Sequence, residues 1–216
     1  IKANDTFKAQ FLYDNLIIQA NLIHGAHLNN INSLMYFGTS CIYPKYAKQP
    51  LKENYLLTGG LEKTNEGYAL AKISGIKMCE YYNFQYGRRY FSVMPTNLYG
   101  PNDNYDLKNS HVLPALLLKM HKAKIKNQKN IELWGTGKPK REFLHVDDLA
   151  EACIRLITTN HNYSMINIGS GKDLTIRELA KLIKQIVGYK GDLKFNKLYD
   201  GTPRKLLDIS KIKKLG

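Results

Sequence analysis

Short apolar segments alternate with helical ones along this chain, and this alternation limits the folds that it can adopt. A short apolar run occupies residues 34–37, mostly apolar segments of strand length occupy residues 90–94 and 165–168, and the first and last of the three are followed by glycine. Apolar spacing, the carboxylates at Asp147 and Asp148, and a capping box at Thr175 and Glu178 predict helices over residues 7–29, 68–82, 111–124, 147–157 and 175–188. Strands that alternate with helices form a mostly parallel sheet covered on both faces. The sequence therefore predicts an α/β fold.

The composition favours a globular protein and leaves its partner open. Of the 216 residues, 44% are hydrophobic and 23% are charged, which is too apolar for a disordered chain. No apolar run reaches the roughly 18 residues of a membrane helix, and the first residues lack the apolar stretch of a signal peptide. Three scattered cysteines favour a reducing cytoplasm. The net charge of +14 fits nucleic acid, a nucleotide cofactor or a nucleotide sugar, or simply solvated lysines.

Tyr68 and Lys72 form a candidate acid–base pair on one helix. They are four residues apart and so share a helix face. A nearby ammonium group favours a phenolate and is expected to lower the pKa of Tyr68 from about 10 toward neutrality. A hydroxyl from the end of the first predicted strand, Thr39 or Ser40, could hold a reacting carbonyl oxygen beside Tyr68, because ligands bind at the carboxyl ends of parallel strands. Without this context, the pair would be one more solvated helix pair.

Several segments together resemble the extended short-chain dehydrogenase/reductase family. They are FGTSCIYPKYAKQPLKEN, TNEGYALAKISGIK, SVMPTNLYGPNDN, NSHVLPALL and WGTGKPKREFLHVDDLA, and they follow the family's order over nearly the whole chain. They are most similar to the members that convert GDP-4-keto-6-deoxy-D-mannose to GDP-L-fucose. The resemblance implies a Rossmann-like doubly wound parallel sheet that binds NADP(H), with a smaller α/β substrate-binding domain. The expected divisions are residues 1–98 and 143–169 for the first domain, and 99–142 and 170–216 for the second.

The resemblance also implies a two-stage reaction in one site. The keto sugar is epimerised at C3 and C5 through enolates, and NADPH then delivers hydride to C4. Cys41 and His111 match the family's proton-transfer pair, although a lone cysteine is usually a small core residue and a lone histidine at a helix start is usually a cap. Thr39 and Tyr68 would stabilise the enolate oxygen. Tyr68 would then protonate the C4 alkoxide beside Lys72.

Further positions match the cofactor and substrate sites of the family. Those that line the nicotinamide half of the cofactor are Phe37, Gly38, Thr39, Ser40, Lys72, Pro95, Thr96, Asn97, Leu98 and His111. Those that match the nucleotide-sugar site are Lys119, Trp134, Arg141 and Asp200. An arginine can bind a diphosphate through two hydrogen bonds, and Trp134 either packs on the nucleoside or is a buried aromatic. Arg204 and Lys205 also match the family and are equally compatible with a structural role.

The family's Gly-rich turn, which binds the cofactor pyrophosphate at a helix N-terminus, does not occur in the printed sequence. By resemblance, Ile1 aligns just before the helix that precedes the catalytic strand. We therefore expect the N-terminal strands of the Rossmann half to be missing, the C-terminus to stop early, and the chain to be a fragment of a working enzyme. The mass of the natural gene product tests this expectation.

Three other functions remain open from the sequence. One is a different nucleotide-sugar epimerase or dehydratase of the same family. Another is a basic nucleic-acid-binding module, which only the charge favours, and the last is a non-catalytic truncated remnant. No metal site is predicted, because His24 and His27 lack a third ligand. The expected partners are a GDP-sugar and, by resemblance, a second copy in a homodimer, with no nucleic acid and no membrane.

Overall fold

The computed structural model describes residues 2–107, 110–196 and 200–216, so residue 109 of the segment NSHVLPALL lies outside the described residues. The helices are α1 (Lys2–Thr6), α2 (Lys8–Leu28), α3 (Glu66–Tyr86), α4 (Val112–Ile125), α5 (Val146–Thr158), α6 (Ile176–Val187) and α7 (Ser210–Lys213). Short 3-10 turns are η1 (Ser40–Ile42), η2 (Glu53–Tyr55) and η3 (Lys63–Asn65). The strands are β1 (Ser33–Phe37), β2 (Arg89–Pro95), β3 (Asn97–Tyr99), β4 (Asn130–Leu133), β5 (Lys140–His145), β6 (Met165–Ile168), β7 (Asp173–Thr175), β8 (Asp192–Phe195) and β9 (Arg204–Lys205).

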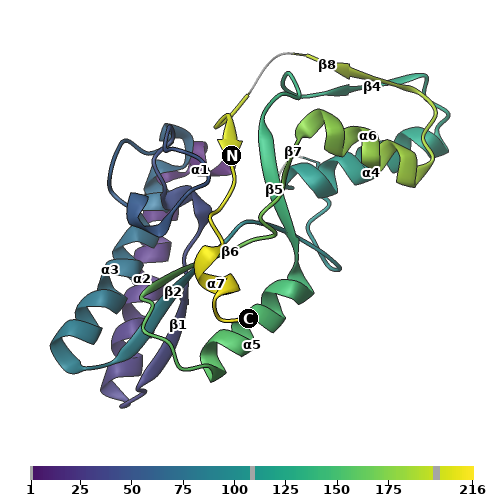
Figure 1. Ribbon diagram of the computed structural model, residues 1–216. Helices are drawn as coiled ribbons and strands as arrows, with labels where there is room; N and C mark the ends of the chain where they lie inside the picture. The colour runs from purple at the N-terminus through teal and green to yellow at the C-terminus, as the bar shows by residue number, and fades with distance from the viewer. Residues whose placement is uncertain (1, 108–109, 197–199) are drawn as a thin grey trace.

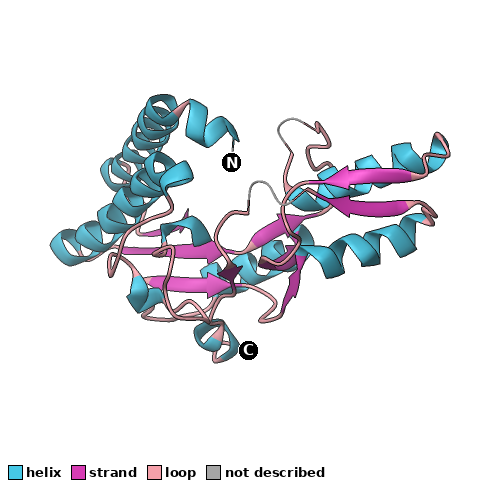
Figure 2. Ribbon diagram, turned by 90° about the horizontal axis from the view of Figure 1, so that it is seen from above, coloured by secondary structure: helices cyan, strands magenta, loops and turns pink. Residues whose placement is uncertain are grey.

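A parallel sheet in the order β1-β2-β6 forms the centre of the larger lobe. Helices α2 and α3 lie side by side on one face of this sheet, and α5 lies on the other (Figures 1 and 2). The three strands are the three segments expected from the sequence: β6 has the expected limits, β1 is one residue longer at its start, and β2 is one residue longer at each end. The predicted α/β fold with helices on both faces of a parallel sheet is therefore confirmed.

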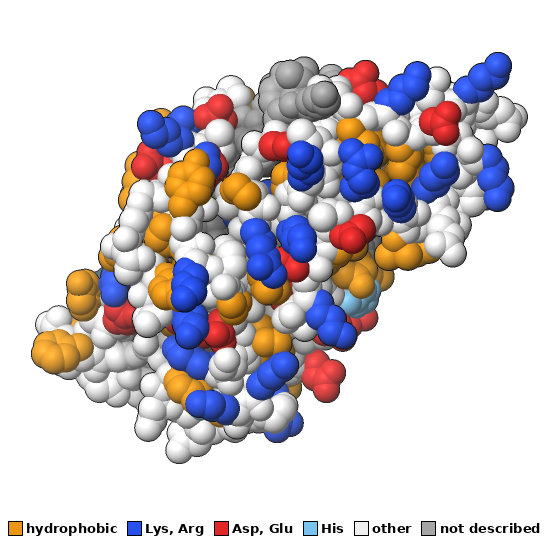
Figure 3. Space-filling model, turned by 45° about the horizontal axis from the view of Figure 1, so that its top comes forward, with side chains coloured by type: hydrophobic (Ala, Val, Ile, Leu, Met, Phe, Trp, Pro, Cys, Tyr) orange, Lys and Arg blue, Asp and Glu red, His pale blue; other side chains and the backbone are white. Residues whose placement is uncertain are grey.

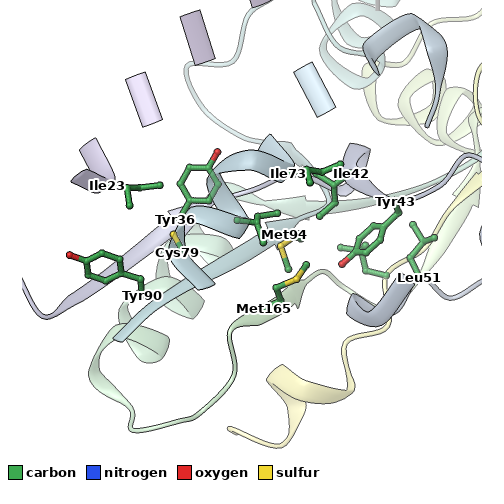
Figure 4. Packing of buried hydrophobic residues seen from close by; sticks show 12 residues of the cluster. Ile23, Tyr36, Ile42, Tyr43, Leu51, Ile73, Cys79, Tyr90, Met94 and Met165 are labelled. Atoms are coloured by element: carbon green, nitrogen blue, oxygen red, sulfur yellow. The ribbon is translucent and has the colours of Figure 1, made fainter. Parts of the chain in front are cut away.

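Side chains of β2 point alternately to the two faces of the sheet, so the core of this lobe has two layers. Tyr90 and Met94 point toward α2 and α3 and pack with Ile23, Ile76 and other residues (Figure 4). Phe91 and Val93 point the other way, into a cluster with residues of α5 and β6. Successive strand residues face opposite sides of a sheet, so a continuous apolar run is what a strand covered on both faces requires.

The first strand differs from the expectation of a strand buried on both faces. In the described part of the chain β1 pairs only with β2, so it is an edge strand. Tyr36 is buried, whereas Phe37 is 42% exposed. The composition of the run could not reveal its place in the sheet, because a central and an edge strand of this kind share the same apolar residues.

A second lobe has its own apolar core. Helices α4 and α6 pack together and against the parallel pair β4–β8, around Leu116, Met120, Ile131, Leu179 and Ile183 (Figure 1). Strand β5 connects the lobes, since it pairs with β3, β7 and β9. The expected domain limits at residues 98/99 and 142/143 fall within the paired strands β3 and β5, and they stay a prediction.

The starts of α5 and α6 follow local capping chemistry, and the start of α5 differs from expectation. At α6, the Thr175 hydroxyl accepts from the N–H of Glu178, the Glu178 carboxylate accepts from the N–H of Thr175, and the helix ends at Gly188 with a φ of 72°, as predicted. Helix α5 begins at Val146, earlier than predicted from Asp147 or Asp148. Its cap is His145, whose ring nitrogen accepts from the N–H of Asp147.

Candidate active site

The carboxyl end of β1 turns directly into a polar loop that carries Thr39 and Cys41. Gly38 lies at this turn in a tightly packed place, since a Cβ there would lie 3.2 Å from the Met94 sulfur and 3.3 Å from Ile76 Cδ1. The Thr39 hydroxyl caps η1 by accepting from the backbone N–H of Cys41 at 3.3 Å. Ser40 is buried, whereas Thr39 and Cys41 are half-buried. Of the two candidate hydroxyls, Thr39 is the one that interacts with Tyr68.

Tyr68 and Lys72 lie on α3, facing the end of β1. The ammonium of Lys72 donates to the carbonyl of Phe37 at 3.0 Å and lies 5.0 Å from the centre of the Tyr36 ring and 5.9 Å from that of Tyr68. Lys72 and Tyr68 are both half-buried. A solvated helix pair would show neither the burial nor the fixed carbonyl contact, so this interpretation of the pair is wrong.

The electrostatics of Tyr68 differ from the sequence expectation. Burial raises the pKa of Tyr68, and the nearby charge of Cys41 raises it further, while a hydrogen bond with Thr39 lowers it in part. Burial also lowers the pKa of Lys72. The expected lowering of the tyrosine pKa by Lys72 is therefore wrong for this structure, because desolvation of the phenolate dominates.

Cys41 has two cationic side chains near it. Burial raises the pKa of its thiol, but the ammonium of Lys205, a hydrogen bond with Thr39 and the guanidinium of Arg141 together lower it below its ordinary value. The Lys205 nitrogen lies 3.3 Å from the sulfur. Cys41 is thus no inert core residue. Its contact with Lys205 was not predicted, because nothing in the sequence relates positions 164 residues apart.

Two of the residues expected to contact the cofactor after β2 are held by Glu142 on β5. The Thr96 hydroxyl and the Asn97 amide both donate to the Glu142 carbonyl, at 3.1 and 2.8 Å. Pro95 is the last residue of β2, and Leu98 lies in β3. His111 immediately precedes α4 and is exposed, and its side chain does not cap the helix. Within the described ranges, no hydrogen bond or ring contact joins His111 to Cys41 or Tyr68.

The four residues expected to bind the nucleotide sugar lie on or beside the second lobe. Lys119 on α4 donates to the Glu132 carbonyl at 2.8 Å. Asp200 accepts from the backbone N–H and the hydroxyl of Thr136, at 2.9 and 2.6 Å. Arg141 on β5 is half-buried, and its charge interacts with those of both Cys41 and Asp200. Trp134 is 63% exposed, so it is not the buried aromatic of the alternative interpretation.

The site offers donors suited to a nicotinamide nucleotide and a charged sugar. The Lys72 ammonium has three N–H groups and uses one on Phe37, which leaves donors for ribose hydroxyls beside Tyr68 and Thr39. Lys and Arg side chains are spread across the face shown in Figure 3, which suits a polyanionic substrate. In the described part of the chain, no group of three His, Cys, Asp or Glu side chains could hold a metal ion. No helix there is long and apolar enough to cross a membrane.

Comparisons with known proteins agree with this fold and site. Residues 1–169 match the NAD dependent epimerase/dehydratase family, and the chain belongs to that family. Within it, the whole chain is 54% identical to the GDP-L-fucose synthase of Escherichia coli (strain K12) and spans 70% of that protein.

Two solved structures have the same fold. A GDP-6-OMe-4-keto-L-xylo-heptose reductase from C. jejuni superposes with a TM-score of 0.92 at 40% identity, over 100% of this chain and 74% of that one. A GDP-L-fucose synthetase from Naegleria fowleri bound to NADP gives a TM-score of 0.90 at 27% identity, over 97% of this chain and 68% of that one. The predicted resemblance to reductases and epimerases of nucleotide sugars is confirmed.

Proposed function

We propose that this chain carries the catalytic groups that convert GDP-4-keto-6-deoxy-D-mannose to GDP-L-fucose, by epimerisation at C3 and C5 and NADPH-dependent reduction at C4. The observation that carries the proposal is a thiol of lowered pKa, Cys41, adjoining the Thr39–Tyr68–Lys72 group of a reductase. An enzyme that only reduces the ketone needs Thr39, Tyr68 and Lys72 and has no need of the thiol. An activated thiol beside it supplies a base for removing protons next to the ketone.

In the epimerisation, Cys41 removes the proton from the carbon next to the C4 ketone as the thiolate. The electron pair of the broken C–H bond moves to the ketone oxygen, where the hydroxyls of Thr39 and Tyr68 stabilise the enolate. His111 returns a proton to the opposite face of that carbon. Tyr68 suits a donor role here, because its raised pKa keeps the hydroxyl protonated at neutral pH.

In the reduction, NADPH supplies hydride to C4 when bound. Lys72 and the residues at the ends of β1 and β2, 37–40 and 95–98, would hold its nicotinamide half, together with His111. Tyr68 donates its proton to the alkoxide that forms at C4. One N–H of Lys72 is used by the Phe37 carbonyl, and the remaining N–H groups would bind the ribose hydroxyls of the cofactor.

The nucleotide sugar would bind along the second lobe. Arg141 and Lys119 supply positive charge for the diphosphate, and the exposed indole of Trp134 offers a surface on which a base can stack. The alternative is another nucleotide-sugar epimerase or dehydratase of the same family that acts on a different sugar, and the role of Cys41 distinguishes the two. The relative from C. jejuni acts on such a different GDP-sugar. The 54% identity with a GDP-L-fucose synthase favours the first assignment.

We further propose a cytoplasmic homodimer with the two domains at the limits given above. Cys41, Cys79 and Cys153 are all free thiols, which fits a reducing compartment. The outer sides of α2 and α3 expose large apolar side chains, among them Tyr13, Ile17, Leu70 and Tyr81. Exposed apolar residues on two adjacent helices suit burial against the same helices of a second copy.

The decisive variant is Cys41→Ser in the protein assayed with substrate in deuterium oxide. We expect the wild type to incorporate solvent deuterium at C3 and C5, and the variant to lose this exchange by about 10²-fold or more because a serine hydroxyl is not ionised at neutral pH. Cys153→Ser is the matched control, since this thiol lies on α5 and faces the apolar core. Exchange that continued unchanged in Cys41→Ser would contradict the role of this thiol.

A further inference from the structure

Strand β9 carries two cations, and the structure gives them different partners. Arg204 and Lys205 are consecutive, so their side chains leave the strand on opposite sides. The Arg204 guanidinium binds the carboxylate of Asp173, with contacts of 2.5 and 3.3 Å. Lys205 points instead to Cys41, with 3.3 Å between its Nζ and the sulfur. Arg204 therefore has a structural ion pair, whereas Lys205 contacts a group of the active site.

The backbone of Lys205 is held firmly on both sides, so its contact with Cys41 is built into the fold. Strand β9 pairs with β5, with Lys205 beside Arg141. The Gln49 side chain accepts from the N–H of Leu206 at 3.0 Å and donates to the Arg204 carbonyl at 3.2 Å. The N–H of Leu207 donates to Glu142 at 2.9 Å. These contacts fix the backbone from which the Lys205 side chain reaches Cys41, so pairing with a thiolate costs only side-chain entropy.

The charges around Cys41 leave Lys205 as its closest cation. From β5, Arg141 adds a second positive charge, and from α3, Tyr68 presents its hydroxyl. The Glu62 carboxylate lines the same small cleft but is paired with Lys45 at 2.9 Å. Arg204 also lines that cleft and is neutralised by Asp173. The balance of charge at the sulfur is thus positive, with Lys205 in direct contact.

We propose that Lys205 is a positioning residue of the epimerisation, whose ammonium holds Cys41 as the thiolate that removes the sugar proton. This inference rests on the proposed function. The C–H bond breaks, the proton joins the Cys41 sulfur, and the electron pair passes to the ketone oxygen as the enolate. A proton from His111 then completes the epimerised carbon, so the step involves no net oxidation or reduction. Lys205 transfers no proton and acts through the sulfur.

The test is the pH dependence of Cys41 alkylation by iodoacetamide in the protein without substrate, followed on the Cys41 peptide by mass spectrometry. We expect Lys205→Met to shift the half-reaction pH upward and to slow alkylation at neutral pH about tenfold, because an ammonium within a few ångströms lowers an acid's pKa by at least about one unit. Lys205→Arg should retain most of the reactivity. Arg204→Gln, on the other side of the same strand, should leave the pH dependence of Cys41 alkylation unchanged.

The catalytic readout is deuterium exchange at C3 and C5. Lys205→Met should shift the acidic limb of the exchange profile upward by the same amount as the alkylation profile. A variant that raises only the KM for the nucleotide sugar and leaves alkylation unchanged would overturn the inference, since Lys205 would then bind substrate alone. An alkylation shift without any change in exchange would also overturn it. If Lys205→Met does not fold, Lys205→Gln against Lys205→Arg makes the same comparison.

Failure of this inference is distinguishable from failure of the proposed function. If Cys41→Ser retains exchange, the thiol is not the base, and the proposed function fails whatever Lys205 does. If Cys41→Ser loses exchange while Cys41 of the Lys205→Met variant is alkylated with the same pH dependence as in the wild type, only the role of Lys205 fails.

Discussion

At the scale of single residues, a buried hydrogen-bond chain fixes the helix that carries Tyr68 and Lys72. The Tyr36 hydroxyl donates to the buried Gln19 side chain at 2.5 Å, and the Gln19 amide donates to the carbonyl of Ala71 on α3 at 2.5 Å. Gly75 lets the Tyr36 ring approach, because a Cβ at Gly75 would lie 2.5 Å from the ring. The ring of Tyr36 in turn lies under the Lys72 ammonium. Residues of α2 and β1 thereby position a side chain of α3.

Removing the Tyr68 hydroxyl should separate the two halves of the reaction. We expect Tyr68→Phe to lower the rate of NADPH oxidation by about 10² to 10⁴-fold, the usual contribution of one acid catalyst. Deuterium exchange should persist at a reduced rate, since Thr39 still contacts the enolate. Tyr81→Phe on the same helix, 65% exposed, is the matched control. An equal loss in the rates of NADPH oxidation and of deuterium exchange would contradict the separate roles given to Tyr68 and Cys41.

The two half-reactions should also respond differently to pH. The thiolate of Cys41 is the active form and its pKa is lowered, so exchange should rise with pH and level off below pH 9, the ordinary thiol value. The protonated form of Tyr68 is the active one and its pKa is raised, so the reduction should lose this acid only above pH 10. Initial rates of exchange and of NADPH oxidation across this range check both limbs. Exchange that still climbs above pH 9 would contradict an activated thiol.

At the scale of elements, Glu142 joins three segments that are distant in sequence. Its side chain is fully buried and accepts from the N–H of Gly171, after β6, at 2.6 Å, and from the N–H of Leu207, after β9, at 2.9 Å. Gly169 adjoins it so closely that any Cβ there would collide with the carboxylate. Glu142 therefore holds both the chain that follows β6 and the strand that carries Lys205 against β5.

We expect Glu142→Gln to lower the free energy of unfolding by about 1–3 kcal/mol, because an amide cannot accept from both N–H groups and one is left unsatisfied. Urea unfolding followed by circular dichroism measures this change. Glu151→Gln on α5, where the side chain is exposed, should stay within about 0.5 kcal/mol of the wild type. Equal urea midpoints for the two variants would show that the Glu142 carboxylate does not hold these segments together.

The sequence predicted these elements unevenly, for physical reasons. Helices α2 and α3 are long and periodic, and strands β2 and β6 are mostly apolar and bounded by proline or glycine, so the sequence predicted all four. Strands β3, β7 and β9 have only two or three residues, too few for any period. Their pairing with β5 is a tertiary effect. Cys41, Tyr68 and Lys72 were identified through motifs, whereas the contact of Lys205 with Cys41 depends on that unpredicted pairing.

At the scale of the whole molecule, the two lobes have separate apolar cores, and the outer sides of α2 and α3 remain exposed. Tyr13 is 63% exposed and Tyr81 is 65% exposed, although neither belongs to the proposed site. Aromatic side chains of this size are costly to leave in water and are common in interfaces between subunits. The homodimer proposed above would bury them.

If the protein is the dimer proposed above, Ile17→Arg on α2 should convert it to a monomer, because a charge in an apolar interface loses its hydration without gaining a partner. Sedimentation velocity at micromolar concentration measures the state. Ile154→Arg on α5, where Ile154 is 66% exposed across the sheet from α2, should remain dimeric. Two variants with the same sedimentation coefficient would locate the interface elsewhere.

The measurement that tests the central claim most directly is the product formed from GDP-4-keto-6-deoxy-D-mannose and NADPH in deuterium oxide, identified by nuclear magnetic resonance. Epimerisation followed by reduction predicts GDP-L-fucose with deuterium at C3 and C5. A 4-reduced sugar of unchanged configuration, with hydrogen at both carbons, would mean that the site reduces without epimerising. That result would contradict the roles given to Cys41 and His111.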